Sequence, residues 1–180
     1  MAGLSKSDYD TFAQTVYDQH IGRLIYPEVR QLIIAHQKAG HTVAIVSSAT
    51  RFQLLGAAKD LGIEHIYCTE LETIDDVFTG HIDGPPCFGI GKVNAAKQLL
   101  KKTKGRLSNT FFYSDSTDDA DLLVACGRPV ALNPSRSLTK MAREHDWPSA
   151  TFDSRGRPTL GQLVRSLAAT SSVISSFAAG

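Results

Sequence analysis

The segment HTVAIVSS, residues 41–48, is the feature that most restricts how this chain can fold. It is a short, continuous apolar run that ends in two serines, and a helical pattern closed by Gly62 follows it at residues 51–62. Runs of this kind are typical of parallel strands that are covered on both faces, because such strands bury both rows of side chains. A strand followed directly by a helix predicts an α/β fold.

The same alternation continues along the chain. Strands are expected at residues 63–68, 109–113 and 129–132, and helices at residues 4–24, 27–37, 92–105, 118–126 and 137–145. Residues 77–89, VFTGHIDGPPCFG, have the glycine and proline content of a hairpin or an irregular loop. Strands that alternate with helices favour a mainly parallel sheet with helices on its faces.

Composition excludes several classes of protein. With 180 residues, 42% of them hydrophobic, the chain is long enough for one domain with a full core. Lys and Arg total 19 and Asp and Glu total 18, and no long basic run occurs. The sequence therefore lacks the electrostatic pattern of a nucleic-acid-binding protein, and we expect a small-molecule partner.

The cysteines and the N-terminus indicate the compartment. Cys68, Cys87 and Cys126 are widely spaced and form no C-x-x-C pair, which favours reduced, buried thiols over disulfides or a zinc site. The start, MAGLSKSDYD, has no apolar signal segment, and no stretch approaches the roughly 20 apolar residues of a membrane span. We therefore expect a cytoplasmic protein without a membrane span.

Polar residues follow the predicted strands where α/β proteins bind their ligands, outside the carboxyl ends of the strands. Ser47 and Ser48 end one strand, Lys92 opens a helix after Gly89-Ile90-Gly91, and Asp115 and Asp119 follow another strand. A hydroxyl, a fixed cation and a carboxylate pair suit a phosphoryl group and a hard cation such as Mg²⁺.

Each of these residues also has an ordinary structural explanation. Serines after a strand often cap a helix, and Asp118, Asp119 and Asp121 could simply complement a helix dipole. Lys92 is less easily explained, because the dipole disfavours a cation in the first turn. Asp115 precedes its helix, so capping alone does not account for it. The order Ser, Lys, Asp-x-x-x-Asp is more specific than any one of its members.

Three segments resemble motifs of the haloacid dehalogenase superfamily, in its phosphoserine-phosphatase-like subfamily: IVSSAT its second motif, GKVNAA its third and YSDSTDD its fourth. The segments TGHIDGPPCFGIGK and GRPVALNP are also similar, and the resemblance covers about residues 25–150. It implies a Rossmann-like parallel sheet with flanking helices and a helical cap. It also implies a Mg²⁺-dependent phosphomonoester hydrolase that acts on a small phosphorylated substrate.

The resemblance assigns roles to the polar residues. Ser47 would bind the phosphoryl group, Lys92 would stabilise a phosphoaspartyl intermediate, and Asp115 would bind Mg²⁺, with Asp119 as the second acid of the motif. The expected site residues are therefore Ser47 and Lys92 for catalysis, Asp115 and Asp119 for the metal, and Ser48 and Asp118 for the substrate.

The family's first motif, a strand followed by D-x-D-x-[TV], is not recognisable. Its first Asp is the nucleophile that attacks phosphorus. The only candidate, Asp8-Tyr9-Asp10, follows the short polar segment MAGLSKS, and Phe12 stands where Thr or Val is needed. Ser7 and Asp8 instead predict the start of a helix with Phe12 and Val16 on its apolar face. We expect the nucleophilic Asp and its strand, which is central in the family's sheet, to be missing.

This gap leads to an expected division of a truncated chain: a remnant of the helical cap at residues 1–26, the core at 27–158 and a C-terminal helix or linker at 159–180. A catalytically inactive metal- or phosphate-binding module stays open as an alternative, as does a fragment of a fusion with an acyltransferase. Self-association, or complementation by a chain that supplies the strand, would cover the gap. His36, His41 and His65 are expected to be surface or packing residues.

Overall fold

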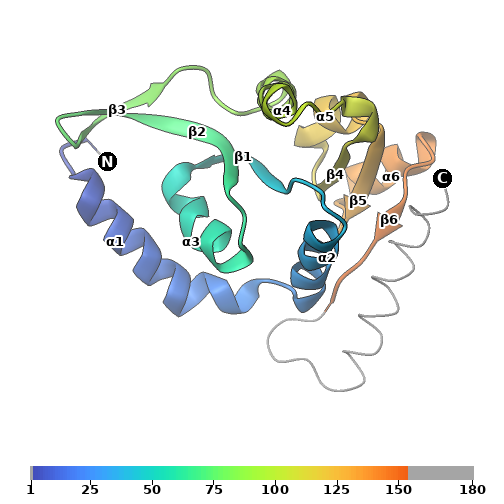
Figure 1. Cartoon of the computed structure of the whole chain (residues 1–180), viewed down its shortest axis with the longest axis horizontal. Helices are drawn as coiled ribbons and strands as arrows, with labels where there is room; N and C mark the ends of the chain where they lie inside the picture. The colour runs from blue at the N-terminus through green and yellow to red at the C-terminus, as the bar shows by residue number, and fades with distance from the viewer. Residues whose placement is uncertain (1, 154–180) are drawn as a thin grey trace. The chain divides into compact units, whose positions relative to one another are not determined.

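The structure, a computed structural model, describes residues 2–153 (Figure 1). The predicted C-terminal segment 159–180 lies outside them. The chain divides into two compact units, Met1–Gly22 with Val43–Leu107 (unit 1) and Arg23–Thr42 with Ser108–Gly180 (unit 2). Single-turn helices, Gly22–Leu24 and Leu107–Asn109, occur where the chain passes from one unit to the other.

Unit 1 begins with helix α1 (Lys6–Val16), which continues as a π-helical turn at Tyr17–Ile21. The Ser5 hydroxyl caps α1 by accepting a hydrogen bond of 3.1 Å from the Asp8 backbone N–H. The prediction of a helix start is confirmed. Of the two residues predicted on its apolar face, Val16 is half-buried, but the prediction for Phe12 is wrong. Phe12 is 60% exposed, whereas Tyr9 packs edge-on against the rings of Phe52 and Phe78. Tyr9, and not Phe12, packs inward because the aromatic rings of Phe52 and Phe78 lie on its side of the helix.

The sheet of unit 1 has the order β1-β2-β3. Strand β1 (Ala44–Thr50) leads through α3 (Arg51–Leu61) to the parallel strand β2 (His65–Ile74), and Gly62 ends α3 with a φ of 63°. Strand β2 is longer than predicted because β3 (Val77–Asp83) folds back along it (Figure 1). The two turn residues, Asp75 and Asp76, have φ values of 50° and 64°, as a tight hairpin turn requires.

Helix α4 (Ile90–Thr103) packs against β1 and β2. Its entry depends on Gly91, because a Cβ atom at this position would lie 2.4 Å from the Pro86 carbonyl oxygen. The Gly-Ile-Gly sequence before Lys92 therefore permits a close approach of two backbone segments.

Unit 2 holds α2 (Pro27–Lys38) and a sheet of order β4-β5-β6 whose pairs are all parallel. The elements after α2 are β4 (Phe111–Ser114), a 3-10 turn η4 (Thr117–Asp119), α5 (Ala120–Ala125), β5 (Arg128–Leu132), α6 (Arg136–Glu144) and β6 (Ser149–Ala150). Leu123, Ala131, Leu138 and Ala142 form its core, at 0 to 1% exposure. Strand β6 was not predicted, since two residues carry no periodic pattern.

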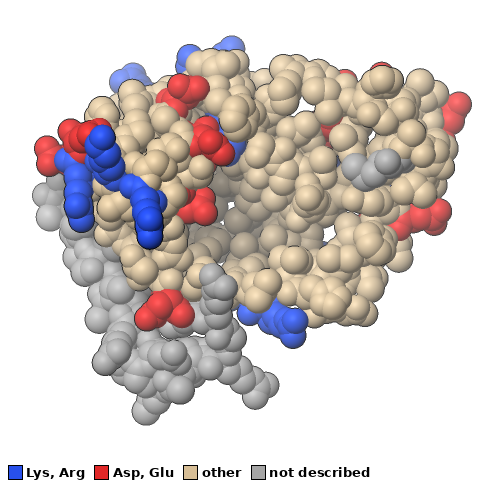
Figure 2. Space-filling view, turned by 180° about the vertical axis from the view of Figure 1, so that it is seen from behind, with Lys and Arg blue, Asp and Glu red and all other residues tan. Residues whose placement is uncertain are grey.

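The α/β class is confirmed, and the strands form two three-stranded sheets, one in each unit. Strand β1 ends one sheet and strand β4 ends the other, so each pairs with one neighbour among residues 2–153. All three cysteines are free thiols, as predicted. Helices long and apolar enough to cross a bilayer are absent from the described part of the chain. Figure 2 shows acidic and basic side chains interspersed on the face that it draws.

Candidate functional site

Ser47 lies in a β-bulge of β1. Strand β1 pairs with β2 as far as Val46 and again at Thr50, so three residues, Ser47, Ser48 and Ala49, stand opposite the single residue between Tyr67 and Thr69. Bulges of this kind often lie beside functional sites because they redirect side chains and free backbone groups. The Ser47 hydroxyl is half-buried and accepts a hydrogen bond of 3.1 Å from the Ala49 N–H. Ser48 is exposed.

Thr69, which the sequence analysis did not identify, holds this bulge in place. Its buried hydroxyl donates to the Ser48 carbonyl oxygen at 2.9 Å and accepts from the Cys87 N–H at 3.2 Å. Cys87 belongs to the loop that enters α4. Thr69 therefore connects the Ser47 segment to the segment that leads to Lys92, and a threonine inside a strand gives no sequence signal of such a role.

Lys92 lies in the first turn of α4 and is only 7% exposed. Burying an ammonium group is costly unless it meets an anion, and the helix dipole adds to this cost at the N-terminal end. Helix α4 packs against β1 and β2, and Lys92 belongs to the same unit as Ser47. The burial of Lys92 distinguishes it from an ordinary solvated first-turn lysine.

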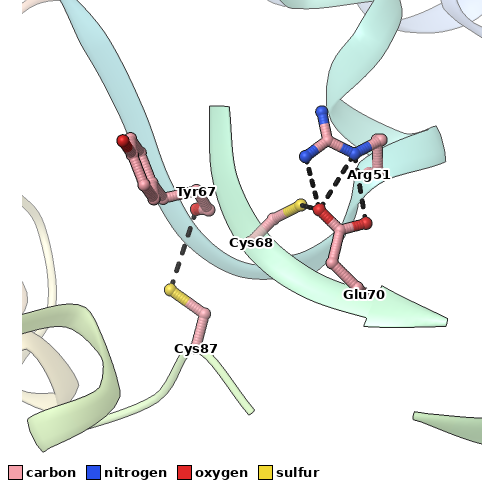
Figure 3. Close-up of polar contacts among 5 residues, drawn as sticks. All are labelled: Arg51, Tyr67, Cys68, Glu70 and Cys87. Carbon is pink, nitrogen blue, oxygen red and sulfur yellow. Dashed lines mark hydrogen bonds and ion pairs between the residues drawn. The ribbon is translucent and has the colours of Figure 1, made fainter. Parts of the chain in front are cut away.

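Arg51, the first residue of α3 after the carboxyl end of β1, forms an ion pair with Glu70 of β2 (Figure 3). The Arg51 Nε donates to both Glu70 oxygens at 2.9 and 3.1 Å, and Nη2 donates to Oε1 as well. The hydrogen bond to Glu70 raises the pKa of Arg51. Cys68 donates from its Sγ to Glu70 Oε1 at 3.5 Å, and burial, followed by the Glu70 charge, raises the pKa of this thiol to about 11. Cys68 is therefore a protonated, unreactive thiol.

The Cys87 thiol also makes a hydrogen bond within unit 1. It is buried, and its Sγ points to the Tyr67 carbonyl oxygen at 3.7 Å (Figure 3). Thiol chemistry therefore does not explain this part of unit 1.

The acidic turn after β4 is held by a buried serine. Ser114 donates from its hydroxyl to Asp119 Oδ2 at 2.7 Å and accepts from the Ser116 N–H at 3.1 Å. The Asp115 carbonyl accepts from the Ser135 N–H at 2.8 Å, whereas Asp115 is exposed and its carboxylate makes no hydrogen bond with residues 2–153. The turn fixes Asp119 and leaves the Asp115 carboxylate facing solvent.

Asp118 is exposed in η4, and its backbone N–H donates to the Ser116 hydroxyl at 3.1 Å. This N-cap accounts for the backbone at Asp118, while its carboxylate remains on the surface. Ser114 and Ser116 thus support the acidic turn, a role that their place beside four carboxylates in the sequence only hinted at.

The predicted site residues are divided between the two units. Unit 1 contains Ser47, Ser48 and Lys92, and unit 2 contains Asp115, Asp118 and Asp119. Each set is ordered by its own hydrogen bonds within its own unit.

The carboxylates of unit 2 fit a hard cation in part. Asp115 and Asp119 offer oxygen ligands on one turn, and Mg²⁺ commonly takes one or two protein carboxylates and keeps its waters. Groups of three or more His, Cys, Asp or Glu side chains that could hold a metal ion are absent from residues 2–153.

The candidate nucleophiles of the sequence analysis do not lie at the end of a strand. Asp8 and Asp10 are in α1, where the Asp8 N–H takes part in the helix cap and Tyr9 packs against aromatic rings. Their helical setting agrees with the prediction made from the polar segment before them.

Comparison with known proteins identifies relatives. A family model described as haloacid dehalogenase-like hydrolase matches residues 1–123. A protein named histidinol-phosphatase from Neisseria meningitidis is 35% identical over 156 residues, which are 84% of this chain and 70% of that protein. Phosphoserine phosphatase SerB1 of Mycobacterium tuberculosis is 32% identical over 151 residues, but the chain spans only 49% of its length.

Solved structures agree on the fold. A protein of unknown function from Bordetella pertussis superposes with a TM-score of 0.76 at 29% identity, over 83% of this chain and 68% of that one. A probable phosphoserine phosphatase from Vibrio cholerae gives a TM-score of 0.61 at 22% identity, over 81% of this chain and 42% of that one, and supports the fold alone. The family match, the Neisseria relative and the fold lead to one conclusion: this chain belongs to the haloacid dehalogenase-like hydrolase family.

Proposed function

We propose that the chain carries most of the site of a Mg²⁺-dependent phosphomonoester hydrolase that acts on a small phosphorylated substrate in the cytoplasm. The observation that carries this proposal is the buried Lys92 in the first turn of α4, in the same unit as the Ser47 bulge. A buried cation in the same unit as a bulge that presents a hydroxyl suits an anion with several oxygens. The names of the relatives, histidinol-phosphatase and phosphoserine phosphatase, support a phosphate ester as that anion.

Each residue has a role in this proposal. Ser47 donates a hydrogen bond to a phosphoryl oxygen, and Lys92 neutralises charge on the transferring group. Asp115 binds Mg²⁺ directly, and Asp119, held by the Ser114 hydroxyl, is the second carboxylate at the metal. Bound Mg²⁺ would stabilise negative charge on the phosphoryl oxygens. Ser48 and Asp118 are both exposed and would contact the substrate on its solvent side.

We further propose that the attacking carboxylate comes from a strand outside the described residues. Strand β1 and strand β4 each end a sheet, and an end strand offers unpaired N–H and C=O groups to another strand. The chain also spans only about half the length of its mycobacterial relatives. In this proposal residues 1–26 are the remnant of a cap, residues 27–158 are the core, and self-association or a complementing chain covers the free edges.

A silent phosphate-binding module is the second candidate. It is favoured by one observation: within residues 2–153, Asp8 and Asp10 lie on a helix, whereas the proposed chemistry needs its nucleophile at the end of a strand. Such a module would bind phosphate and Mg²⁺ without turnover.

Phosphate binding to the full chain tests the proposal. Lys92→Met should weaken binding of inorganic phosphate by at least about tenfold, because the charged hydrogen bond is lost. Lys97→Met, which removes an exposed lysine from the same helix, should leave binding unchanged. Equal affinity for phosphate in all three proteins, measured by calorimetry, would refute the anion site.

Turnover separates the two candidates. Release of phosphate from an aryl phosphate with Mg²⁺ is measured for the chain alone and after addition of a peptide with an apolar strand that ends in D-x-D-G-T. We expect activity only with the peptide, lost in Asp115→Asn and kept in Asp121→Asn. Activity of the chain alone would show that its own residues supply the nucleophile. Phosphate binding without turnover, with or without the peptide, would establish the silent module.

A further inference from the structure

The imidazoles of His36 and His41 meet end to end in unit 2. Their Nδ1 atoms are 2.8 Å apart and their ring centroids are 5.1 Å apart. The distance between the centroids equals the distance between the nitrogens plus the centroid-to-nitrogen distance within each ring. The two nitrogens therefore point directly at each other, as in an N–H···N hydrogen bond. A shared metal ion would require two bonds meeting at an angle, which brings the centroids closer together. The geometry indicates a shared proton.

The sequence HQKAGH creates this contact. The His41 N–H donates to the His36 carbonyl at 3.0 Å and the Gly40 N–H donates to the Gln37 carbonyl at 3.0 Å, while Gly40 has a φ of 77°. This pair of bonds is the Schellman motif, which ends a helix and brings the residue directly after the αL glycine onto the last turn. The contact is usually made by two apolar side chains, and here both are imidazoles.

Strand β4 supplies the third member of the array. The second ring nitrogen of His36, Nε2, lies 2.7 Å from the Tyr113 hydroxyl. Phe111 stacks on His41 and lies edge-on to His36, and the Arg128 guanidinium lies 5.0 Å from the Phe111 ring centroid. The array thus fastens the C-terminal end of α2 to the strand from which the Asp115 turn leaves.

Counting protons shows which charge states the array accepts. A neutral pair has one N–H between the two Nδ1 atoms. One further proton fits on His41, which is exposed and can donate from Nδ1 to a neutral His36. A second further proton does not fit, because two N–H groups and two positive charges would then face each other. The α2 carbonyls favour the first charge, while the charge on His41 opposes the second.

We propose that His36, His41 and Tyr113 form a pH-sensitive latch that holds the end of α2 on β4 and opens when both imidazoles become protonated. Burial lowers the pKa of His36 below its ordinary value of 6.5, and the electrostatic effect of His41 is the second, smaller cause. The stability from neutral His36 is therefore complete above pH 6.5 and is lost as the pH falls through the lowered pKa.

The test uses the full chain without phosphate or Mg²⁺, with EDTA present, so it is independent of the proposed hydrolase function. Thermal unfolding is followed from about pH 7.5 to about pH 5. We expect the melting temperature of the wild type to fall by roughly 3 °C or more beyond the fall in His36→Gln. His81→Gln removes an exposed histidine of unit 1 and should melt like the wild type throughout.

A histidine NMR titration provides the second measurement and does not depend on the stability of a variant. His36 should stay neutral at a pH below its ordinary pKa of 6.5, and Tyr113→Phe should change the His36 ring signals. An ordinary or raised pKa for His36, or equal pH dependence in His36→Gln and wild type, would overturn the latch. A melting temperature that drops on addition of EDTA in the wild type but not in His36→Gln would show that a metal ion joins the two imidazoles, which would also overturn it.

Discussion

The two units order their predicted site residues by different means. Unit 1 has a mixed sheet, an irregular β1 and a buried lysine, and its predicted residues are joined through Thr69. Unit 2 has an all-parallel sheet over a core at 0 to 1% exposure, and its acids lie on an exposed turn. The proposed function expects this difference: a phosphoryl site needs a desolvated cation, whereas a carboxylate that binds a hydrated ion can remain in water.

The largest effect is expected from the core of unit 2. Leu138→Ala should destabilise the chain by about 2–5 kcal/mol, because Leu138 is fully buried and its neighbours cannot fill the space. Val124→Ala is the matched control, since Val124 is 59% exposed. Urea unfolding measures both. Similar midpoints for the two variants would show that this core does not dominate the stability of unit 2.

Gly91→Ala tests the entry to α4 in unit 1. Helix propensity alone predicts that alanine stabilises by about 1 kcal/mol. The contact of its Cβ with the Pro86 carbonyl predicts the opposite, a loss of about 1–3 kcal/mol together with weaker phosphate binding. Asn94→Ala, at an exposed position of the same helix, is the control. A more stable Gly91→Ala protein would mean that the backbone can move away from Pro86.

Thr69→Val removes the hydroxyl that joins β1 to the loop before α4. The side chain keeps its shape, but the Cys87 N–H loses its acceptor, so we expect a loss of about 1–2 kcal/mol in unfolding free energy. Binding of inorganic phosphate should also weaken if the bulge moves. Thr103→Val, an exposed helix position, controls for the substitution itself. Unchanged phosphate affinity would separate Thr69 from the anion site.

The smallest effect concerns Cys68. Glu70→Gln removes the negative charge beside the thiol, and the pKa of Cys68 should fall from about 11, while burial keeps it above its ordinary value of 9.0. The pH dependence of alkylation, in a protein with the other two cysteines replaced by serine, measures this pKa. A pKa that stays near 11 would assign the whole shift to burial.

Local patterns in the sequence were sufficient for much of the fold. The apolar run before Ser47 predicted β1, Gly62 correctly ended α3, and the polar segment before Asp8 correctly predicted a helix. These features depend on residues close together in the chain, such as caps, periodic patterns and turns. The order Ser47, Lys92, Asp115 also pointed to the family that the comparisons then showed.

Contacts between distant residues were not predictable in this way. Tyr9 rather than Phe12 faces the aromatic rings of unit 1, and Thr69 bridges two segments that are remote in sequence. His36 and His41 were expected to be packing or surface residues, and the hydrogen bond between His36 and Tyr113 needs β4 beside α2. Such features depend on which surfaces meet, which periodicity does not encode.

By itself, the sequence determined the α/β class, the position of most strands and helices, and the residues that could bind a phosphoryl group and a cation. Hydrogen bonds and apolar periodicity within short segments are enough for that. Only the tertiary structure decided that the strands form two sheets, that Lys92 is buried, and that Ser114 holds Asp119. Strand partners, burial and side-chain contacts depend on which elements pack together, and that is settled by the free energy of the whole fold.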